Sequence, residues 1–218
     1  MYLRKLIIFF TVSSFSMCLL LRWCPPPLSM FMLYQQVEDV VNLHTLPRSI
    51  AYRWVSRRDI SAFAGSAVIA AEDQHFIAHY GFDVKAISAA FHHYQNGRSL
   101  HGASTISQQT AKNLFLIPAK SWLRKGLEAW FTCLLELLWD KPRILEMYMN
   151  IAEFGDHLYG IEAASQHYFG VSAKQLTRAQ CALLAAVLPN PKTLNVAHPS
   201  AYVLSRQRWI LRQMRPLP

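Results

Sequence analysis

Apolar residues are spread unevenly along the chain, and the first 23 residues stand apart from the rest. The run 6–21 reads LIIFFTVSSFSMCLLL and holds no charged residue, while Arg4 and Lys5 precede it and Arg22 follows it. Extended to position 23, the run has 18 residues and would form a helix about 27 Å long. A bilayer's hydrocarbon core is roughly 30 Å thick. We therefore expect a membrane-spanning helix over 6–23.

A cleaved signal peptide is the alternative for this segment. No small-x-small cleavage site follows the run, which continues instead into Arg22, Trp23 and Cys24 and then three prolines. This pattern favours an uncleaved anchor. Because the two cations lie before the run, the positive-inside rule predicts that residues 1–5 form a cytoplasmic tail and that 24–218 lie outside the cytoplasm.

Beyond residue 34, apolar residues recur mostly at the three-to-four spacing of helices, and clear alternating strands are absent. Ser104 and Ser121 precede two such stretches and are expected to cap them. The dipeptides Leu188-Pro189 and Asn190-Pro191 mark a break. The expected helices cover 60–79, 84–94, 104–114, 121–139, 142–148, 159–168, 177–187 and 199–214. The fold class predicted from this pattern is all-α, or mainly helical.

Composition narrows the class of protein further. The 218 residues are 52% hydrophobic and only 16% charged, which excludes an intrinsically disordered chain. The net charge of +9 favours an anionic partner, such as an acidic lipid, a phosphate-bearing substrate or nucleic acid. The cations are scattered and no nucleic-acid-binding motif is present, so nucleic acid is the weakest of the three. The four cysteines include no C-x-x-C pair and are expected to be free, buried thiols.

The first candidate for chemistry is the acidic pair Glu72-Asp73. The pair directly follows the apolar stretch 67–71, and partial desolvation there would raise a carboxyl pKa and suit general acid or base work. An ordinary solvated helix end is the alternative reading. His75 and His79 lie four residues apart, as metal ligands often do, but without an H-E-x-x-H pattern we expect packing or hydrogen bonding.

A second cluster is polar in an unusual way. On a helix, Thr105, Gln108, Gln109 and Lys112 share one face. Solvated faces usually carry Glu and Lys, whereas amides and hydroxyls beside one cation suit a ligand rich in hydroxyls, amides and phosphate. A glutamine-rich surface turn is the alternative.

A third cluster contains Arg124 and Lys125 one helical turn before Glu128. Either the three form a weak surface salt bridge, or the carboxylate is held beside cations that bind phosphate. In a fourth cluster, Glu146 and Asn150 lie four residues apart on an expected scaffold helix and are in position to hydrogen-bond inside the fold.

Taken together and in this order, the four clusters resemble the motifs of glycosyltransferase family 51, the peptidoglycan glycan polymerases. The match spans about residues 57–187. Two departures are Ser107, where many members carry Thr, and His157, where a small residue is common. The matching motifs are Glu72-Asp73-x-x-Phe76-x-x-His79-x-Gly81, Gly102-x-Ser104-Thr105-Ile106-x-Gln108-Gln109-x-x-Lys112-Asn113, Arg124-Lys125-x-x-Glu128 and Lys141-x-x-Ile144-Leu145-Glu146-x-Tyr148-x-Asn150.

The resemblance implies a lysozyme-like fold with two lobes around a cleft, and a small hydrophobic lobe at 84–100 that dips into the membrane. It places residues 24–218 in one glycosyltransferase domain in the periplasm, held by a single pass through the bacterial inner membrane. No S-x-x-K motif is present, so a penicillin-binding transpeptidase domain is excluded. The implied partners are lipid II, undecaprenyl-diphosphate-linked glycan and the membrane, with other cell-wall synthesis or division proteins left open and no nucleic acid.

The resemblance also implies the roles of individual residues. Glu72 would be the catalytic base that takes a proton from the 4-hydroxyl of lipid II, and Glu128 the second catalytic carboxylate. Glu128 would either orient cations or hold a divalent ion, Mg²⁺ or Mn²⁺. Direct displacement would invert the sugar to a β-1,4 linkage. The implied substrate-binding residues are Asp73, Ser104, Thr105, Gln108, Gln109, Lys112, Asn113, Lys120, Arg124 and Lys125.

Two other functions stay open at this point. A lysozyme-like enzyme that cleaves glycan would use Glu72 as a general acid, but it would not need cations around a diphosphate. A non-catalytic, membrane-anchored scaffold of the cell-wall machinery would need neither carboxylate. The substitution Glu72→Gln separates an enzyme from a scaffold.

Overall fold

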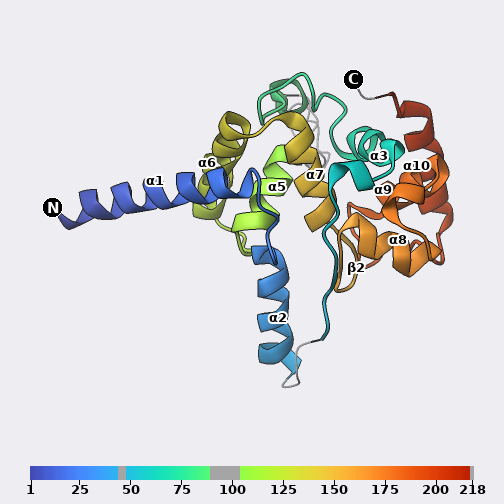
Figure 1. The fold of residues 1–218 in the computed structure, drawn as a ribbon, viewed down its shortest axis with the longest axis horizontal. Coiled ribbons are helices and arrows are strands. Elements are labelled where there is room, and N and C mark those ends of the chain that lie inside the picture. The colour runs from blue at the N-terminus through green and yellow to red at the C-terminus, as the bar shows by residue number, and fades with distance from the viewer. Residues whose placement is uncertain (44–47, 89–103, 217–218) are drawn as a thin grey trace.

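The computed structural model describes residues 1–43, 48–88 and 104–216, and this part of the chain is mainly helical, as predicted (Figure 1). Two single turns of 3-10 helix, η1 (Arg57–Asp59) and η2 (Ala173–Gln175), lie between the longer helices. The α-helices are α1 (Tyr2–Leu21), α2 (Met30–Leu43), α3 (Ala62–Glu72), α5 (Ile106–Phe115), α6 (Trp122–Leu138), α7 (Lys141–Ile151), α8 (Ile161–Phe169), α9 (Arg178–Val187) and α10 (Ala201–Gln213).

The core lies where α5 packs against α6 and α7, and where α3 packs against α9. Helix α10 then covers α9 and part of α3 (Figure 1). Large side chains such as Phe76, Tyr148 and Phe154 are fully buried in this interior. The ends of α3 and α5 are thereby held at the centre of the molecule, where the site described below is found.

Helix α5 begins one residue later than expected, because Thr105 rather than Ser104 is its cap. The Thr105 Oγ1 accepts a hydrogen bond from the Gln108 backbone N–H at 3.2 Å, and Gln108 Oε1 accepts one from the Thr105 N–H at 3.0 Å. This reciprocal pair satisfies two N–H groups at the start of the helix. The cap predicted for α6 is confirmed, since Ser121 Oγ accepts from the Arg124 N–H at 3.1 Å.

Helix α3 ends at Glu72, well before the predicted residue 79. The chain leaves the helix at Asp73, whose carboxylate accepts hydrogen bonds from His79 Nε2 and from the Ile106 N–H, each at 3.0 Å. These long-range partners fold the segment after Glu72 into turns. Helix α8 likewise starts two residues later than predicted, because Gly160 has φ +82° and ends the preceding strand.

A small sheet joins distant parts of the chain. Strand β1 (Ala51–Tyr52) pairs in parallel with β3 (Leu158–Tyr159), which pairs antiparallel with β2 (Glu153–Gly155). Strands of two or three residues are too short to show alternation, so the sequence pattern gave no sign of them.

The predicted helix over 84–94 is seen only as far as residue 88. The rest of that helix, and most of the segment 84–100 expected to enter the membrane, lie outside the described residues, as does Gly102 of the second motif.

Helix α1 is long and apolar enough to cross a membrane, and it is the one such helix in the described ranges. It starts at Tyr2, before the predicted boundary, and packs along α6. The Trp130 indole donates to Ser14 Oγ at 3.1 Å, and the Trp139 indole donates to the Cys18 carbonyl oxygen at 2.8 Å. The anchor is therefore part of the packed structure.

All four cysteines are free thiols, as predicted. Cys18 and Cys181 are buried, but Cys24 and Cys133 are exposed, which corrects the expectation that all four lie inside. Cys133 lies on the outer face of α6 and Cys24 follows the anchor, so neither faces the core.

Candidate active site

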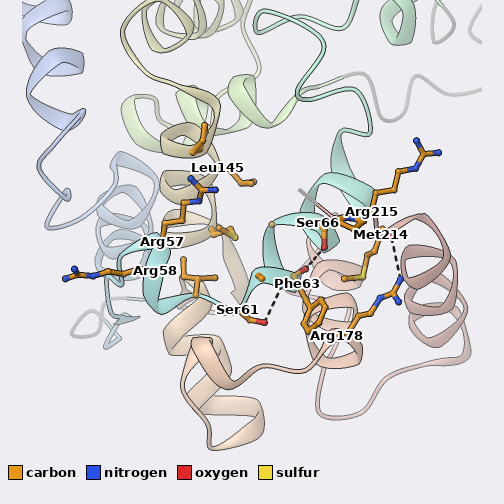
Figure 2. A pocket seen from close by; sticks show the side chains of 15 residues that line it. Arg57, Arg58, Ser61, Phe63, Ser66, Leu145, Arg178, Met214 and Arg215 are labelled. Atoms are coloured by element: carbon orange, nitrogen blue, oxygen red, sulfur yellow. Dashed lines mark hydrogen bonds between the residues drawn. The ribbon is translucent and has the colours of Figure 1, made fainter. Parts of the chain in front are cut away.

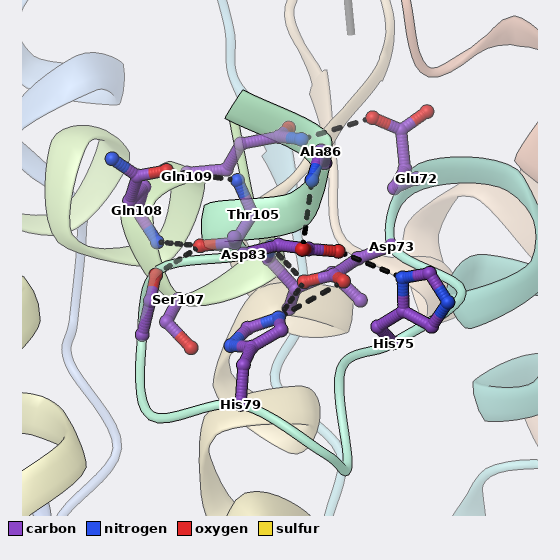
Figure 3. Close-up of polar contacts among 12 residues, drawn as sticks. Glu72, Asp73, His75, His79, Asp83, Ala86, Thr105, Ser107, Gln108 and Gln109 are labelled. Carbon is purple, nitrogen blue, oxygen red and sulfur yellow. Dashed lines mark hydrogen bonds and ion pairs between the residues drawn. The ribbon is translucent and has the colours of Figure 1, made fainter. Parts of the chain in front are cut away.

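Glu72 lies at the last position of α3, facing the start of α5 (Figure 3). Gln109 Nε2 donates to Glu72 Oε2 at 2.9 Å. The other side of that amide, Gln109 Oε1, accepts a hydrogen bond from the Tyr148 hydroxyl at 3.2 Å. Tyr148 thereby fixes which end of the Gln109 amide faces the carboxylate.

Burial raises the pKa of the Glu72 carboxyl above its ordinary value. The hydrogen bond from Gln109 and the positive charges of Arg206 and Lys112 act in the opposite direction and limit this rise. A carboxylate whose pKa is moved toward neutrality is a better proton acceptor than an ordinary one. The desolvated acid expected at the end of the apolar stretch is thus present, and a plain solvated helix end is excluded.

Arg206 is a member of this site that the sequence analysis missed. It comes from α10, and its Nη2 lies 3.1 Å from the Ala71 carbonyl oxygen and 3.5 Å from Glu72 Oε1. The sequence pattern of α10 does indicate a buried role for this residue, because Arg206 shares one helix face with the buried Val203 and Ile210. A charged side chain on an apolar helix face usually has a buried partner.

The third cluster joins a buried carboxylate to two partly exposed cations, so it is not a simple surface salt bridge. The Glu128 side chain is only 4% exposed. Arg124 Nη1 donates to its Oε2 at 2.6 Å, and Lys125 Nζ donates to its Oε1. Arg124 Nε also donates to the Ala119 carbonyl oxygen at 2.6 Å, which holds the guanidinium in place.

Lys112 of α5 lies between the two carboxylates. Burial lowers the pKa of its ammonium group, while attraction to Glu128 and Glu72 supports the charged form. Repulsion from Arg124 and Lys125 adds to the lowering. Helix α5 packs against α6, and Lys112 interacts electrostatically with both Glu72 and Glu128; these residues are called the charged region below.

Asp73 and the two histidines have internal partners (Figure 3). Asp73 is bonded to His79 and to the start of α5, as described above, and His75 Nδ1 lies 2.8 Å from Asp83 Oδ2. The expected hydrogen-bonding role of both histidines is confirmed. A direct contact of Asp73 with substrate stays a prediction, since both of its oxygens already accept internal hydrogen bonds.

The predicted polar face of α5 divides into two parts. Gln109 and Lys112 are half-buried beside Glu72, whereas Thr105 and Gln108 are buried and form the capping box. The Thr105 hydroxyl also donates to the Gly81 carbonyl oxygen at 2.6 Å. Gly81 has φ +82°, and a Cβ there would lie 2.8 Å from a Thr132 methyl, so both features require glycine. Substrate contacts of Thr105 and Gln108 stay predictions.

The remaining predicted residues lie around this region. Ser104 is exposed and lines a hollow of about 210 Å³ together with Glu72 and Trp209. Asn113 is half-buried on α5, and Lys120 is exposed just before α6. Their positions leave them available to a ligand, and their roles stay predictions.

The fourth cluster is structural, as expected. Asn150 Nδ2 donates to the Glu146 carbonyl oxygen at 2.9 Å and to the Val55 carbonyl oxygen at 3.0 Å. Glu146 accepts from the Arg57 N–H at 2.7 Å and from Arg143 Nη1 at 2.8 Å. Helix α7 therefore holds the segment that precedes α3.

The surroundings of Glu128 do not fit a divalent ion. Both oxygens of this carboxylate are engaged by cationic side chains. Within the described residues, no group of three or more His, Cys, Asp or Glu side chains is arranged to hold a metal ion. The residues around Glu128 therefore leave no free carboxylate oxygen for Mg²⁺ or Mn²⁺.

Comparison with known proteins agrees with this arrangement. A family model described as Transglycosylase matches residues 39–215. A protein of Pasteurella multocida is 53% identical over 205 residues, covering 94% of this chain and 83% of its own length. Proteins of Stutzerimonas stutzeri and Shewanella oneidensis are each 49% identical over 99% of this chain, covering 88% and 91% of their own lengths. All three carry the name biosynthetic peptidoglycan transglycosylase.

Proposed function

We propose, because this chain belongs to the transglycosylase family, that Glu72 and the charged region around Lys112 carry out glycan polymerisation. The chain is a peptidoglycan glycosyltransferase. The observation that supports the mechanism best is the buried Glu72 carboxylate, bonded to Gln109 and close to Arg206, with cations gathered next to it.

Glu72 acts as the general base. The 4-hydroxyl of a lipid II acceptor attacks the anomeric carbon of the growing glycan, and its proton passes to the Glu72 carboxylate. A bond forms between the acceptor oxygen and the anomeric carbon as the bond from that carbon to the diphosphate breaks. Attack opposite the leaving group turns an α-linked donor into a β-1,4-linked product.

The cations stabilise the leaving group. The undecaprenyl diphosphate departs with the bonding electrons, and its growing negative charge needs positive charge nearby. In our proposal Lys112, Arg124 and Lys125 supply it, and the hydrogen bonds of Glu128 to Arg124 and Lys125 support this role. In this proposal Glu128 is thus a positioning carboxylate.

The membrane places enzyme and substrates together. We infer that α1 crosses the bacterial inner membrane once, with residues 1–5 in the cytoplasm and the catalytic domain in the periplasm. Lipid II and undecaprenyl-diphosphate-linked glycan are anchored in the same membrane, which raises their effective concentration at the site. Interactions with other cell-wall synthesis or division proteins belong to this proposal as well.

The cation cluster is what favours synthesis over the alternatives. A glycan-cleaving enzyme needs an acid and a second carboxylate, but no set of cations around a diphosphate. A scaffold would have no need of a carboxylate that burial has made more basic.

The test is polymerisation of labelled lipid II by detergent-purified protein, with products sized on a gel. Glu72→Gln keeps the shape of the side chain but removes the base, so we expect at least about a 10²-fold loss of rate. Glu38→Gln on α2 is the matched control for loss of one negative charge. If both variants make polymer, Glu72 is not the base. If the wild type instead shortens preformed glycan, the reaction is cleavage and not synthesis.

A further inference from the structure

A second, larger hollow lies at the opposite end of α3 from Glu72 (Figure 2). Its volume is about 770 Å³, which is in the range of small-molecule and peptide sites. Its walls come from η1, the start of α3, one face of α7, the start of α9 and the segment after α10. None of its lining residues takes part in the catalytic site described above.

The rim of this hollow is positively charged. Four arginines line it, and no aspartate or glutamate is among its lining residues. Arg178 Nη2 donates to the Leu211 carbonyl oxygen at 2.8 Å, which holds that guanidinium at the rim. Across the described ranges, the side chains of Arg57 and Arg215 form no ion pair. The four arginines are Arg57, Arg58, Arg178 and Arg215.

The floor of the hollow is apolar. Phe63, at the first turn of α3, is 47% exposed and lines the hollow. Leu145, Met149 and Met214 line the hollow with it. An occupant that matches both parts carries carboxylates at its edge and small aliphatic groups toward the floor.

The position of the hollow argues against lipid headgroups as that occupant. Helices α9 and α10 lie at the end of the molecule away from the N-terminus of α1 (Figure 1). If α1 crosses the membrane, this end is turned away from the bilayer surface. The anionic ligand must then come from the aqueous side.

We propose that this hollow binds the anionic peptide carried by a peptidoglycan strand. This inference rests on the proposed function, since the enzyme makes such strands and meets their peptides at high local concentration. These peptides are short and combine alanine methyl groups with free carboxylates, which matches the floor and the rim. Helix α3 connects the hollow to Glu72 over 11 residues, or about 16 Å, so a strand in the site has neighbouring peptides within reach.

Binding of a soluble probe tests the inference directly. The probe is a fluorescent disaccharide-pentapeptide without lipid or diphosphate, measured by fluorescence polarisation with the full-length chain in detergent. We expect the double variant Arg57→Ala/Arg215→Ala to raise the Kd at least tenfold. Arg208→Ala/Arg212→Ala removes the same charge from exposed positions on α10 outside the hollow, and should leave the Kd within twofold.

A second variant probes the floor. Phe63→Glu places a negative charge beside the rim and should weaken binding at least as much as the loss of two arginines. Circular dichroism of each variant confirms that it is folded. Equal binding by wild type and both folded variants would overturn the inference.

Two further probes define the ligand. The disaccharide without peptide should not bind, and tight binding of it would overturn the proposal. A glutamate-rich peptide of equal charge should bind more weakly. If it binds as tightly as the pentapeptide probe, the hollow is a site for acidic protein segments and the proposal fails.

Polymerisation of lipid II, measured on the same protein, separates this inference from the proposed function. A chain that makes polymer but does not bind the probe disproves the peptide site alone. A chain that binds the probe through Arg57 and Arg215 but makes no polymer disproves the function and supports the site.

Discussion

Arg206 and Glu72 show how two residues far apart in the sequence determine one chemical property. Burial raises the pKa of the Glu72 carboxyl above its ordinary value. The Arg206 guanidinium, 3.5 Å from Glu72 Oε1, opposes that rise together with Gln109 and Lys112. The net result is a pKa that stays above the ordinary value, so the Glu72 carboxylate is more basic than one in water.

The pH dependence of activity should report this balance. The base works when deprotonated, so activity rises with pH through the raised pKa of Glu72. Arg206→Gln removes one opposing charge and should move this rising part of the pH profile to higher pH. Initial rates of polymerisation between pH 5 and 9 give the comparison, with the exposed Arg208→Gln as control. If the rising part of the pH profile of Arg206→Gln does not move, Arg206 contributes to the structure and not to the pKa of Glu72.

Much of the catalytic site could be predicted from short-range patterns. The pairing of Arg124 and Lys125 with Glu128 follows from helical spacing, and the desolvation of Glu72 follows from the apolar run before it. Arg206 was missed because its contact with Glu72 spans 134 positions. The pattern on α10 indicates that Arg206 has a buried partner, but it does not identify that partner. The burial of Glu128 likewise depends on how α5 packs against α6.

At the scale of elements, local signals placed most helices but not all of their ends. Pro142 at the first turn of α7 and Thr177 before α9 give boundaries that agree with the structure. The end of α3 and the choice of cap for α5 depend on tertiary contacts. The former is set by hydrogen bonds from His79 and Ile106 to Asp73, which intrinsic helix propensity does not reveal.

The two adjacent hydroxyl residues before α5 give a direct test of its cap. Thr105→Ala removes the capping hydrogen bond and the bond to the Gly81 carbonyl oxygen, and should lower the free energy of unfolding by about 1–2 kcal/mol. Ser104→Ala changes an exposed residue and should cost less than about 0.5 kcal/mol. Urea unfolding in detergent measures the free energy of unfolding of both variants. A larger loss for Ser104→Ala than for Thr105→Ala would show that Ser104 is the cap.

Helix α2 is held to the turn between β2 and β3 by an ionic network that the sequence did not suggest. His157 Nε2 lies 2.8 Å from Asp39 Oδ2, and its Nδ1 lies 3.0 Å from Asp156 Oδ1. Arg48 bonds both carboxylates, at 3.2 Å and 2.6 Å. His157 has φ +60°, a conformation that costs a non-glycine residue energy. The contacts of His157 with Asp39 and Asp156 offset that cost.

This network predicts a pH-dependent effect of Asp39→Asn. Burial tends to raise the pKa of Asp39, but hydrogen bonds from Arg48 and His157 outweigh it and hold that pKa at about 2. A lowered pKa stabilises the fold above the ordinary value of 3.8, and the gain is lost as the pH falls toward 2. The variant should therefore be less stable than wild type at pH 7, with a gap that narrows below about pH 4. Urea unfolding at pH 7, 5 and 3, with Asp59→Asn as control, tests this, and a constant gap would contradict it.

For the whole molecule, the important contact is the packing of α1 along α6. The sequence predicted the anchor from its apolar run, but nothing in that run showed that Ser14 and Cys18 would meet Trp130 and Trp139. A bilayer that covers α1 must also reach parts of α6. The apolar side chains of Trp122 and Leu123, 92% and 75% exposed, then have acyl chains rather than water around them.

Tryptophan quenching can locate this boundary. In vesicles that contain phospholipids brominated on the acyl chains, Trp122 should be quenched and Trp209, on α10, should not. Trp122→Phe should therefore remove quenched emission from the full-length protein, while Trp209→Phe should remove unquenched emission. Equal loss from both variants would show that the start of α6 lies outside the membrane.

The join between the anchor and the domain is fixed by Arg143. Its Nη2 donates to the carbonyl oxygens of Leu21 and Cys24, at 2.7 Å and 3.2 Å, and its Nη1 is held by Glu146. A loosely tethered domain can rotate about three axes relative to the membrane. A domain joined to α1 in this way rotates mainly about the bilayer normal. If α1 spans the membrane, every sugar is added at the same inclination to the bilayer, and the packing of α1 then sets the direction in which a new strand leaves the enzyme.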